Sequence, residues 1–406
     1  MSGAAAIDRL DLRLHVEGGR LARFDLTSTR RPEAAKVLEG RPVDEALALV
    51  PLMFALCATA QGAAAGAAIE AALGHRRSPR ILALRRLRVD VEILADHARH
   101  LLVDAPRLVG GSADIPGARR ILGLARALAN ALADPSPAPG PAPGDLARDL
   151  KEAIGTHGFA MPVERFAAIG TARHLIDWAM AAPTSPAHLL REAHVLEGFR
   201  ARKAVAVPPL LAPTAPDEIK ALIGMIDGAA GEAFLARPTW GRCPRATGPA
   251  VRLAGQPLVA RCGADWGAGI TYRLVAVLCE LALLACALPA RIAALEAMAE
   301  GREDGPARSS GDGVSARSSG EGVGMVEAAR GLLIHRVVVR EGRVARWRIL
   351  APTEWNLHPQ GALASLLIGC PVSGTEEACL LAHWLVLALD PCVPCVITAI
   401  GEGADA

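Results

Sequence analysis

Alternation of apolar and polar residues near both ends of the chain predicts two β-hairpins. Residues 10–16 and 21–26 flank a Gly-Gly turn, and residues 332–340 and 343–350 flank a Glu-Gly turn. Between the hairpins, most segments from residue 44 to about residue 299 have a helical period of apolar residues. The chain must therefore combine a largely helical middle with hairpins near its ends.

Bulk properties narrow the class of protein. The most apolar stretch, residues 274–290, is about one turn short of a membrane span and contains Glu280, so we expect a buried core helix and no membrane insertion. A net charge of +2 without a basic block argues against a nucleic-acid partner. Nine cysteines and no secretory signal over residues 1–7 predict reduced thiols and a cytoplasmic location.

Two segments are too rich in Pro, Gly or Ser to form regular structure. Residues 134–144 alternate Pro with small residues and predict a Pro-rich linker or long surface loop. Residues 305–323 contain a duplicated Gly- and Ser-rich stretch and predict a flexible loop. His97 and His100 have the spacing of a metal-binding pair, but their helix is strongly charged, so we expect them on a solvated face.

The cysteine pattern carries the first chemical signal. Cys392 and Cys395 follow an apolar helical run, and thiolates at i and i+3 can bind one soft or borderline metal ion. No second Cys-x-x-Cys exists, which argues against a four-cysteine zinc ribbon. On spacing alone, a metal site and a pair of structural thiols both remain open. Cys57, taken alone, is typical of a small buried hydrophobe.

Four motifs in one order resemble the large subunit of nickel–iron hydrogenases. They are Glu39-Gly40-Arg41-Pro42-Val43-Asp44-Glu45-Ala46 before Cys57, Glu327-Ala328-Ala329-Arg330-Gly331 with His335, Pro352-Thr353-Glu354-Trp355-Asn356, and Asp390-Pro391-Cys392-Val393-Pro394-Cys395. The resemblance spans nearly the whole chain and implies one domain over residues 1–406. The implied fold class is α+β and mainly α, with a central helical bundle and peripheral β-hairpins.

The departures from that family are equally specific. Phe54 stands where the family has its first cysteine, Gln61 where it has a histidine, and Thr398 where it has the histidine after which large subunits are trimmed. Ala35 stands where the family has an acidic residue for proton transfer. This pattern resembles the HupK-type accessory proteins of hydrogenase maturation, which are degenerate relatives of the large subunit.

The resemblance implies a site made of Cys57, Cys392 and Cys395 that transiently holds an Fe(CN)2CO unit, with nickel short of one ligand. Arg330 would steady the cyanide ligands by hydrogen bonds, and Glu327 would lie behind the site. The expected function is a non-enzymatic scaffold or carrier whose partners are the hydrogenase large subunit and other accessory proteins. Two alternatives are a divergent hydrogenase with residual activity and a metal-free docking module.

Overall fold

The computed structural model describes residues 8–30, 32–133, 140–198, 207–212, 215–298 and 319–402. The strands are β1 (Leu10–Glu17), β2 (Arg20–Ser28), β3 (Gly320–Ala328), β4 (Gly331–Arg340), β5 (Arg343–Leu350) and β6 (Cys395–Ile400). The α-helices are α1 (Val43–Leu49), α2 (Ala58–Leu73), α3 (Pro79–Arg99), α4 (Ala105–Leu108), α5 (Ile115–Ala131), α6 (Pro143–Ile154), α7 (Val163–Ala167), α8 (Ala172–Ala181), α9 (Ser185–Gly198), α10 (Pro216–Asp227), α11 (Gly231–Ala236), α12 (Pro249–Arg252), α13 (Pro257–Trp266), α14 (Ile270–Ala297), α15 (Pro352–Asn356), α16 (Ala362–Leu367) and α17 (Thr375–Leu389). Short 3₁₀ helices cover Pro32–Leu38 and Val50–Met53, and π-helical turns cover His100–Asp104 and Gly155–Phe159.

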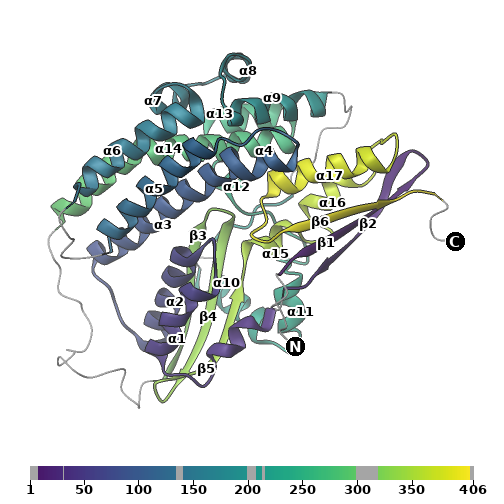
Figure 1. Cartoon of the computed structure of the whole chain (residues 1–406). Helices are drawn as coiled ribbons and strands as arrows, with labels where there is room; N and C mark the ends of the chain where they lie inside the picture. Colours follow the sequence, from purple (N-terminus) through teal and green to yellow (C-terminus); the bar gives the residue numbers. More distant parts are fainter. Residues whose placement is uncertain are drawn as a thin grey trace, which may run out of the picture.

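A bundle of long helices forms one side of the molecule, and two small sheets lie beside it (Figure 1). Helix α14 runs through the bundle and packs against α3, α6, α9 and α13. It is one continuous helix that contains Pro289, and most of its residues are buried. By length and composition α14 could cross a membrane, but here it is the core helix that its sequence predicts. The mainly helical α+β fold is confirmed.

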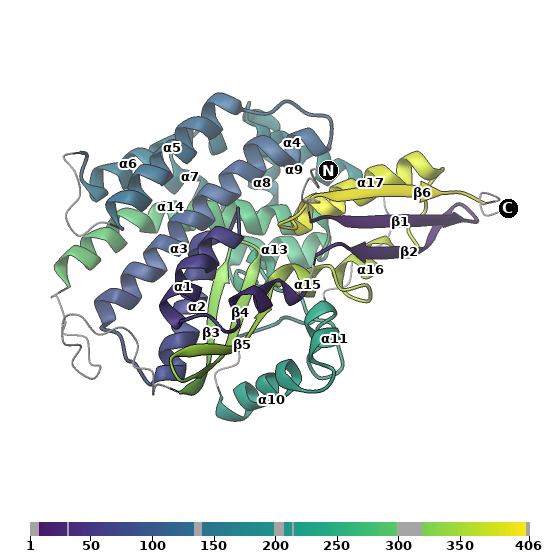
Figure 2. The same ribbon diagram turned by 60° about the horizontal axis from the view of Figure 1, so that its bottom comes forward.

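The first hairpin is confirmed, and the sequence missed its third strand. β1 and β2 pair antiparallel, with Leu12 opposite Leu26. β6 lies on the other side of β1 and runs parallel to it, with Cys395 opposite Leu10. Figure 2 shows the three strands projecting together beside α17. The second cysteine of the Cys-x-x-Cys motif is therefore fixed by strand pairing.

The second hairpin is also confirmed, as β4 and β5, and β3 completes its sheet in the order β3-β4-β5. The predicted flexible loop 305–323 ends too late, because residues 320–323 belong to β3; residues 305–318 lie outside the described residues. Gly320, Gly322 and Gly324 face α2, and a Cβ atom at any of them would collide with the α2 backbone. Here the glycines permit close packing of strand and helix.

The predicted Pro-rich linker 134–144 also ends too late. Residues 134–139 lie outside the described part of the chain, whereas Pro143 and Gly144 form the first turn of α6. Proline suits the first turn of a helix because its missing N–H would have no partner there.

Candidate functional site

Cys57 and Cys392 line one cavity of about 420 Å³. Cys57 immediately precedes α2, and Cys392 lies in the turn between α17 and β6. Phe54 and Ala35, which replace a cysteine and an acidic residue of the hydrogenase motifs, line the same cavity. Side chains far apart in the sequence thus meet around one space, as the motif resemblance predicts.

Cys395 faces a different space. It lines a second cavity of about 390 Å³, whereas Cys392 lines both cavities. The turn that carries Cys392 is therefore the wall between the two. Within the described residues, no three or more His, Cys, Asp or Glu side chains are grouped so that they could hold a metal ion. The structure brings Cys57 and Cys392 to one cavity and leaves Cys395 beside it.

Burial keeps the thiols of Cys57 and Cys395 protonated. Burial, together with the neighbouring Cys392, raises the pKa of Cys57 to about 12, and burial together with Asp11 raises that of Cys395 to about 11. A helix N-terminus would normally favour the Cys57 thiolate. Here, however, the Glu92 carboxylate accepts the N–H groups of Thr59 and Ala60 at 2.7 and 2.9 Å. The negative charge of Glu92 raises the pKa of Cys57 further. A metal ion that binds Cys57 must therefore displace its proton.

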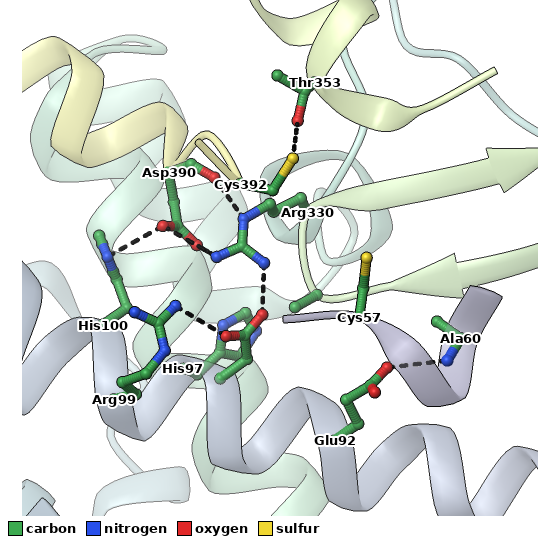
Figure 3. A network of polar contacts seen from close by, with 12 residues as sticks. Cys57, Ala60, Glu92, His97, Arg99, His100, Arg330, Thr353, Asp390 and Cys392 are labelled. Atoms are coloured by element: carbon green, nitrogen blue, oxygen red, sulfur yellow. Dashed lines mark hydrogen bonds and ion pairs between the residues drawn. The ribbon is translucent and has the colours of Figure 1, made fainter. Parts of the chain in front are cut away.

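Arg330 lies beside Cys392, and two carboxylates hold its guanidinium (Figure 3). Nε donates to the Asp390 carbonyl at 2.7 Å, Nη2 pairs with the Asp390 carboxylate at 3.1 Å, and Nη1 donates to Asp96. Burial would lower the pKa of Arg330, but Asp390 and Asp96 outweigh burial and raise it. The guanidinium is permanently charged, and both carboxylates already compensate that charge.

Glu327, which the resemblance places behind the ligands, lines neither cysteine cavity. Its carboxylate accepts from Arg252 at 2.7 Å, and Arg252 also donates to both oxygens of Glu280 on α14. His97 completes this group at 2.8 Å from Glu280. Glu327 therefore connects β3 to the helical bundle.

The expectation that His97 and His100 are solvated is wrong. Their exposed fractions are 2% and 3%, since the histidine side of this helical segment turns inward. His97 contacts Glu280, and Nδ1 of His100 lies 3.1 Å from the Asp390 carboxylate. Asp390 thus has Arg330 on one side and His100 on the other (Figure 3). Both act to hold its pKa below the usual range, although burial alone would raise it.

The sequence motifs did not single out the arginine that lines the cavity of Cys57 and Cys392. Arg30, just after β2, lines the cavity with Cys57 and Cys392, and its Nη1 donates to Glu354 at 2.5 Å. Burial would lower the pKa of Arg30, but Cys392 and Glu354 raise it. The only sequence signal for the ion pair between Arg30 and Glu354 was that Glu354 lies inside the Pro-Thr-x-Trp-Asn motif.

A run of hydrogen bonds reaches Cys57 from the second sheet. The indole nitrogen of Trp347 lies 3.2 Å from Nδ1 of His335, and Nε2 of His335 lies 2.7 Å from Oε1 of Gln61. The amide nitrogen of Gln61 donates to Cys57 Sγ at 3.6 Å. Burial lowers the pKa of His335 to about 3, so its ring stays neutral at physiological pH. Gln61 therefore occupies the place of the hydrogenase histidine as a donor toward sulfur.

Comparison with known proteins shows the family of this chain. The hydrogenase expression/formation protein HupK of Azotobacter vinelandii is 30% identical over 386 residues, which cover 95% of this chain and 96% of that protein. The hydrogenase expression/formation protein HoxV of Cupriavidus necator is 31% identical over 383 residues, which cover 90% of each. This chain belongs to the hydrogenase expression/formation proteins of the HupK and HoxV type.

The fold of this HupK-type protein is that of a hydrogenase large subunit. Residues 268–398 match the nickel-dependent hydrogenase family. The nickel–iron–selenium hydrogenase of Desulfovibrio vulgaris Hildenborough, in its reduced state, superimposes with a TM-score of 0.60 at 18% identity over 93% of this chain and 94% of that chain. The corresponding enzyme of Desulfomicrobium baculatum gives a TM-score of 0.54 at 16% identity, with the same coverage. The large-subunit resemblance is confirmed for the fold.

Proposed function

We propose that this HupK-type protein carries an Fe(CN)2CO unit during assembly of a nickel–iron hydrogenase and catalyses no reaction of its own. The single observation that carries the proposal is the cavity shared by Cys57 and Cys392, with Phe54 at its wall. Two thiolates can hold an iron fragment, whereas a phenyl ring cannot supply the further thiolate that nickel needs. The names of the relatives, hydrogenase expression/formation proteins, support a role in assembly.

The charges around the cavity suit an anionic iron fragment. Arg30 lines the cavity and has donor N–H groups beyond the one that serves Glu354. Cyanide nitrogens are good acceptors, so Arg30 can contact them directly while Arg330 contributes charge from behind Cys392. Because the Cys57 thiol is protonated in the empty site, loading must release a proton, and reprotonation favours release of the cargo.

The proposal places the protein in the cytoplasm, where iron cargo is transferred to the hydrogenase large subunit with the help of other accessory proteins. Cys395 remains a candidate third ligand. It lines the cavity on the other side of the Cys392 turn, together with Cys392. Nickel is not expected in the carrier.

The test is infrared spectroscopy of protein purified anaerobically from cells that express the maturation machinery, with iron and nickel assayed on the same sample. We expect cyanide and carbonyl stretching bands with iron and little nickel. The bands should disappear in Cys57→Ala and Cys392→Ala and persist in the control Cys243→Ala, which removes an exposed cysteine that lines neither cavity. The Cys395→Ala variant decides whether a third thiolate takes part.

Other results would replace the carrier hypothesis. Equal amounts of nickel and iron, with hydrogen oxidation, would identify a divergent hydrogenase. Wild-type protein without bands or metal, together with full hydrogenase maturation in the Cys57→Ala and Cys392→Ala strains, would identify a metal-free docking module.

A further inference from the structure

The hydroxyl group of Thr353 on α15 contacts a candidate cargo ligand directly. Its Oγ1 atom lies 3.3 Å from Sγ of Cys392 (Figure 3). In the part of the chain that the structure describes, this sulfur is the only hydrogen-bond partner of the hydroxyl group. The exposed fraction of Thr353 is 3%, so bulk water has little access to the contact. The hydroxyl group therefore serves the sulfur of Cys392.

Two further contacts of α15 fix the direction of this hydroxyl group. Oδ1 of Asn356 accepts the N–H of Thr247 at 3.0 Å, and Nδ2 of Asn356 donates to the carbonyl of Arg330 at 3.0 Å. The carboxylate of Glu354 accepts a hydrogen bond from Arg30 at 2.5 Å. A side chain on an element that is held in this way is preorganised, as the outer partner of a metal ligand needs to be.

Cargo binding decides which atom of the contact is the donor. In the empty site either the thiol of Cys392 or the hydroxyl group of Thr353 can donate. A cysteine binds a metal as the thiolate, which has no proton. In the loaded site the hydroxyl group must therefore donate and the sulfur must accept. A hydrogen bond to a ligating sulfur withdraws electron density from it and thereby tunes the metal.

We propose that Thr353 is a positioning residue, which orients the Cys392 thiolate and weakens its electron donation to the cargo iron. This inference rests on the proposed carrier function. A weaker donor suits a protein that must hold an iron fragment and then release it. The contact at Cys57 differs, because its sulfur accepts from the Gln61 amide at the longer distance of 3.6 Å. The two candidate ligands are therefore unequal.

The first test removes the hydroxyl group from protein loaded anaerobically with Co²⁺. In Thr353→Val we expect the thiolate-to-cobalt charge-transfer band to move to longer wavelength, because a sulfur without the hydrogen bond gives up electron density more easily. Thr353→Ser keeps a hydroxyl group and should restore the wild-type band. The matched control is Thr156→Val, which removes an exposed hydroxyl group that donates to the Glu152 carbonyl at 3.0 Å.

An unchanged band in Thr353→Val, or an equal shift in Thr156→Val, would overturn the proposal. A wild-type protein that binds Co²⁺ without a thiolate band would overturn it too. If Thr353→Val does not fold, Thr353→Ser and Thr353→Ala provide the same comparison, since they also differ by one hydroxyl group.

Infrared spectra separate this proposal from the carrier function. In protein with cyanide and carbonyl bands, Thr353→Val should shift the carbonyl band to lower wavenumber, because an iron with more electron density donates more of it to the carbonyl ligand. Bands at identical wavenumbers in both proteins would reject the role of Thr353 and leave the carrier function intact. Wild-type protein without bands would reject the carrier function, whereas the cobalt band would still decide whether Thr353 acts on Cys392.

Discussion

Trp347 donates its indole N–H to Nδ1 of His335, and this contact sets the direction of the hydrogen bonds that end at Cys57. An indole nitrogen can only donate, so Nδ1 must accept and Nε2 must carry the proton. Nε2–H then donates to Oε1 of Gln61, which turns the amide nitrogen of Gln61 toward Cys57 Sγ. A tryptophan on β5 thus controls which end of Gln61 faces a candidate ligand.

Loss of the Gln61 donor should make Cys57 a weaker acid. The Gln61 hydrogen bond is among the contacts that lower the pKa of Cys57 against burial. In Gln61→Leu we expect about threefold slower alkylation of Cys57 at pH 8, the size of a weak hydrogen bond. Site-resolved mass spectrometry measures the rate, with Cys243 as an internal reference. Unchanged alkylation of Cys57 would show that the Gln61 contact does not act on the sulfur.

Metal binding should depend steeply on pH because the Cys57 thiol has a pKa of about 12. Below that value each bound thiolate releases one proton, so the contribution of Cys57 raises apparent affinity about tenfold per pH unit. Anaerobic titration with Co²⁺, followed by thiolate charge-transfer absorption between pH 6.5 and 7.5, measures the slope. Cys57→Ala should reduce the slope by one proton. An identical slope in both proteins would exclude Cys57 as a ligand.

Removal of the Asp390 charge should destabilise the protein strongly. In Asp390→Asn, the buried Arg330 keeps only Asp96 as a carboxylate partner. Loss of one member of a buried ion pair lowers the free energy of unfolding by roughly 3–5 kcal/mol. Urea unfolding measures the free energy. The matched control is Asp145→Asn, which breaks an exposed pair with Arg148 and should cost less than about 1 kcal/mol. Similar losses in both variants would refute the buried pairing.

The effect of Asp390 should also vary with pH in a defined direction. Its folded pKa is lowered, so its contribution is complete above the unfolded value of about 4 and decreases as the pH falls below it. Unfolding at pH 6 and pH 3.5 should therefore show a smaller difference between wild type and Asp390→Asn at pH 3.5. A difference that grows in acid would contradict the sign of the pKa shift.

Replacement of Gly322 on β3 should destabilise the protein. An added Cβ would collide with backbone atoms of Ala68 and Ala72 on α2, so Gly322→Ala should cost about 1–3 kcal/mol or more. Gly123→Ala is the control, because its Cβ would meet nothing and alanine favours the helix by about 0.5–1 kcal/mol. Denaturant unfolding of both variants should give opposite signs.

The local alternation of apolar and polar residues predicted both hairpins. The strands that were missed, β3 and β6, depend on contacts with residues far away in the sequence. β1 and β2 alternate and are joined by a tight turn, so their pairing can be read from adjacent residues. β3 is rich in glycine, and its fit depends on α2, which is far away in the sequence. β6 is short and pairs with β1, from the other end of the chain.

The same contrast applies to the candidate site: residues inside motifs were predicted, and residues placed by long-range contacts were not. The motif resemblance identified Cys57, Cys392 and Arg330, because each lies in an ordered signature. It could not place Arg30, whose partner Glu354 is 324 residues away. The many charged residues of its helix wrongly predicted that His97 is solvated. In the structure His97 is buried and contacts Glu280 on another helix.

The parallel pairing of β6 with β1 sets an order of events during synthesis. The turn that carries Cys392 is held by the following strand, β6, which aligns beside the much earlier residues of β1. A ribosome-bound chain whose residues 395–400 are still inside the exit tunnel lacks this pairing. Under the proposed carrier function, such a chain could not receive cargo between Cys57 and Cys392, and loading would wait until residues 395–400 pair with β1.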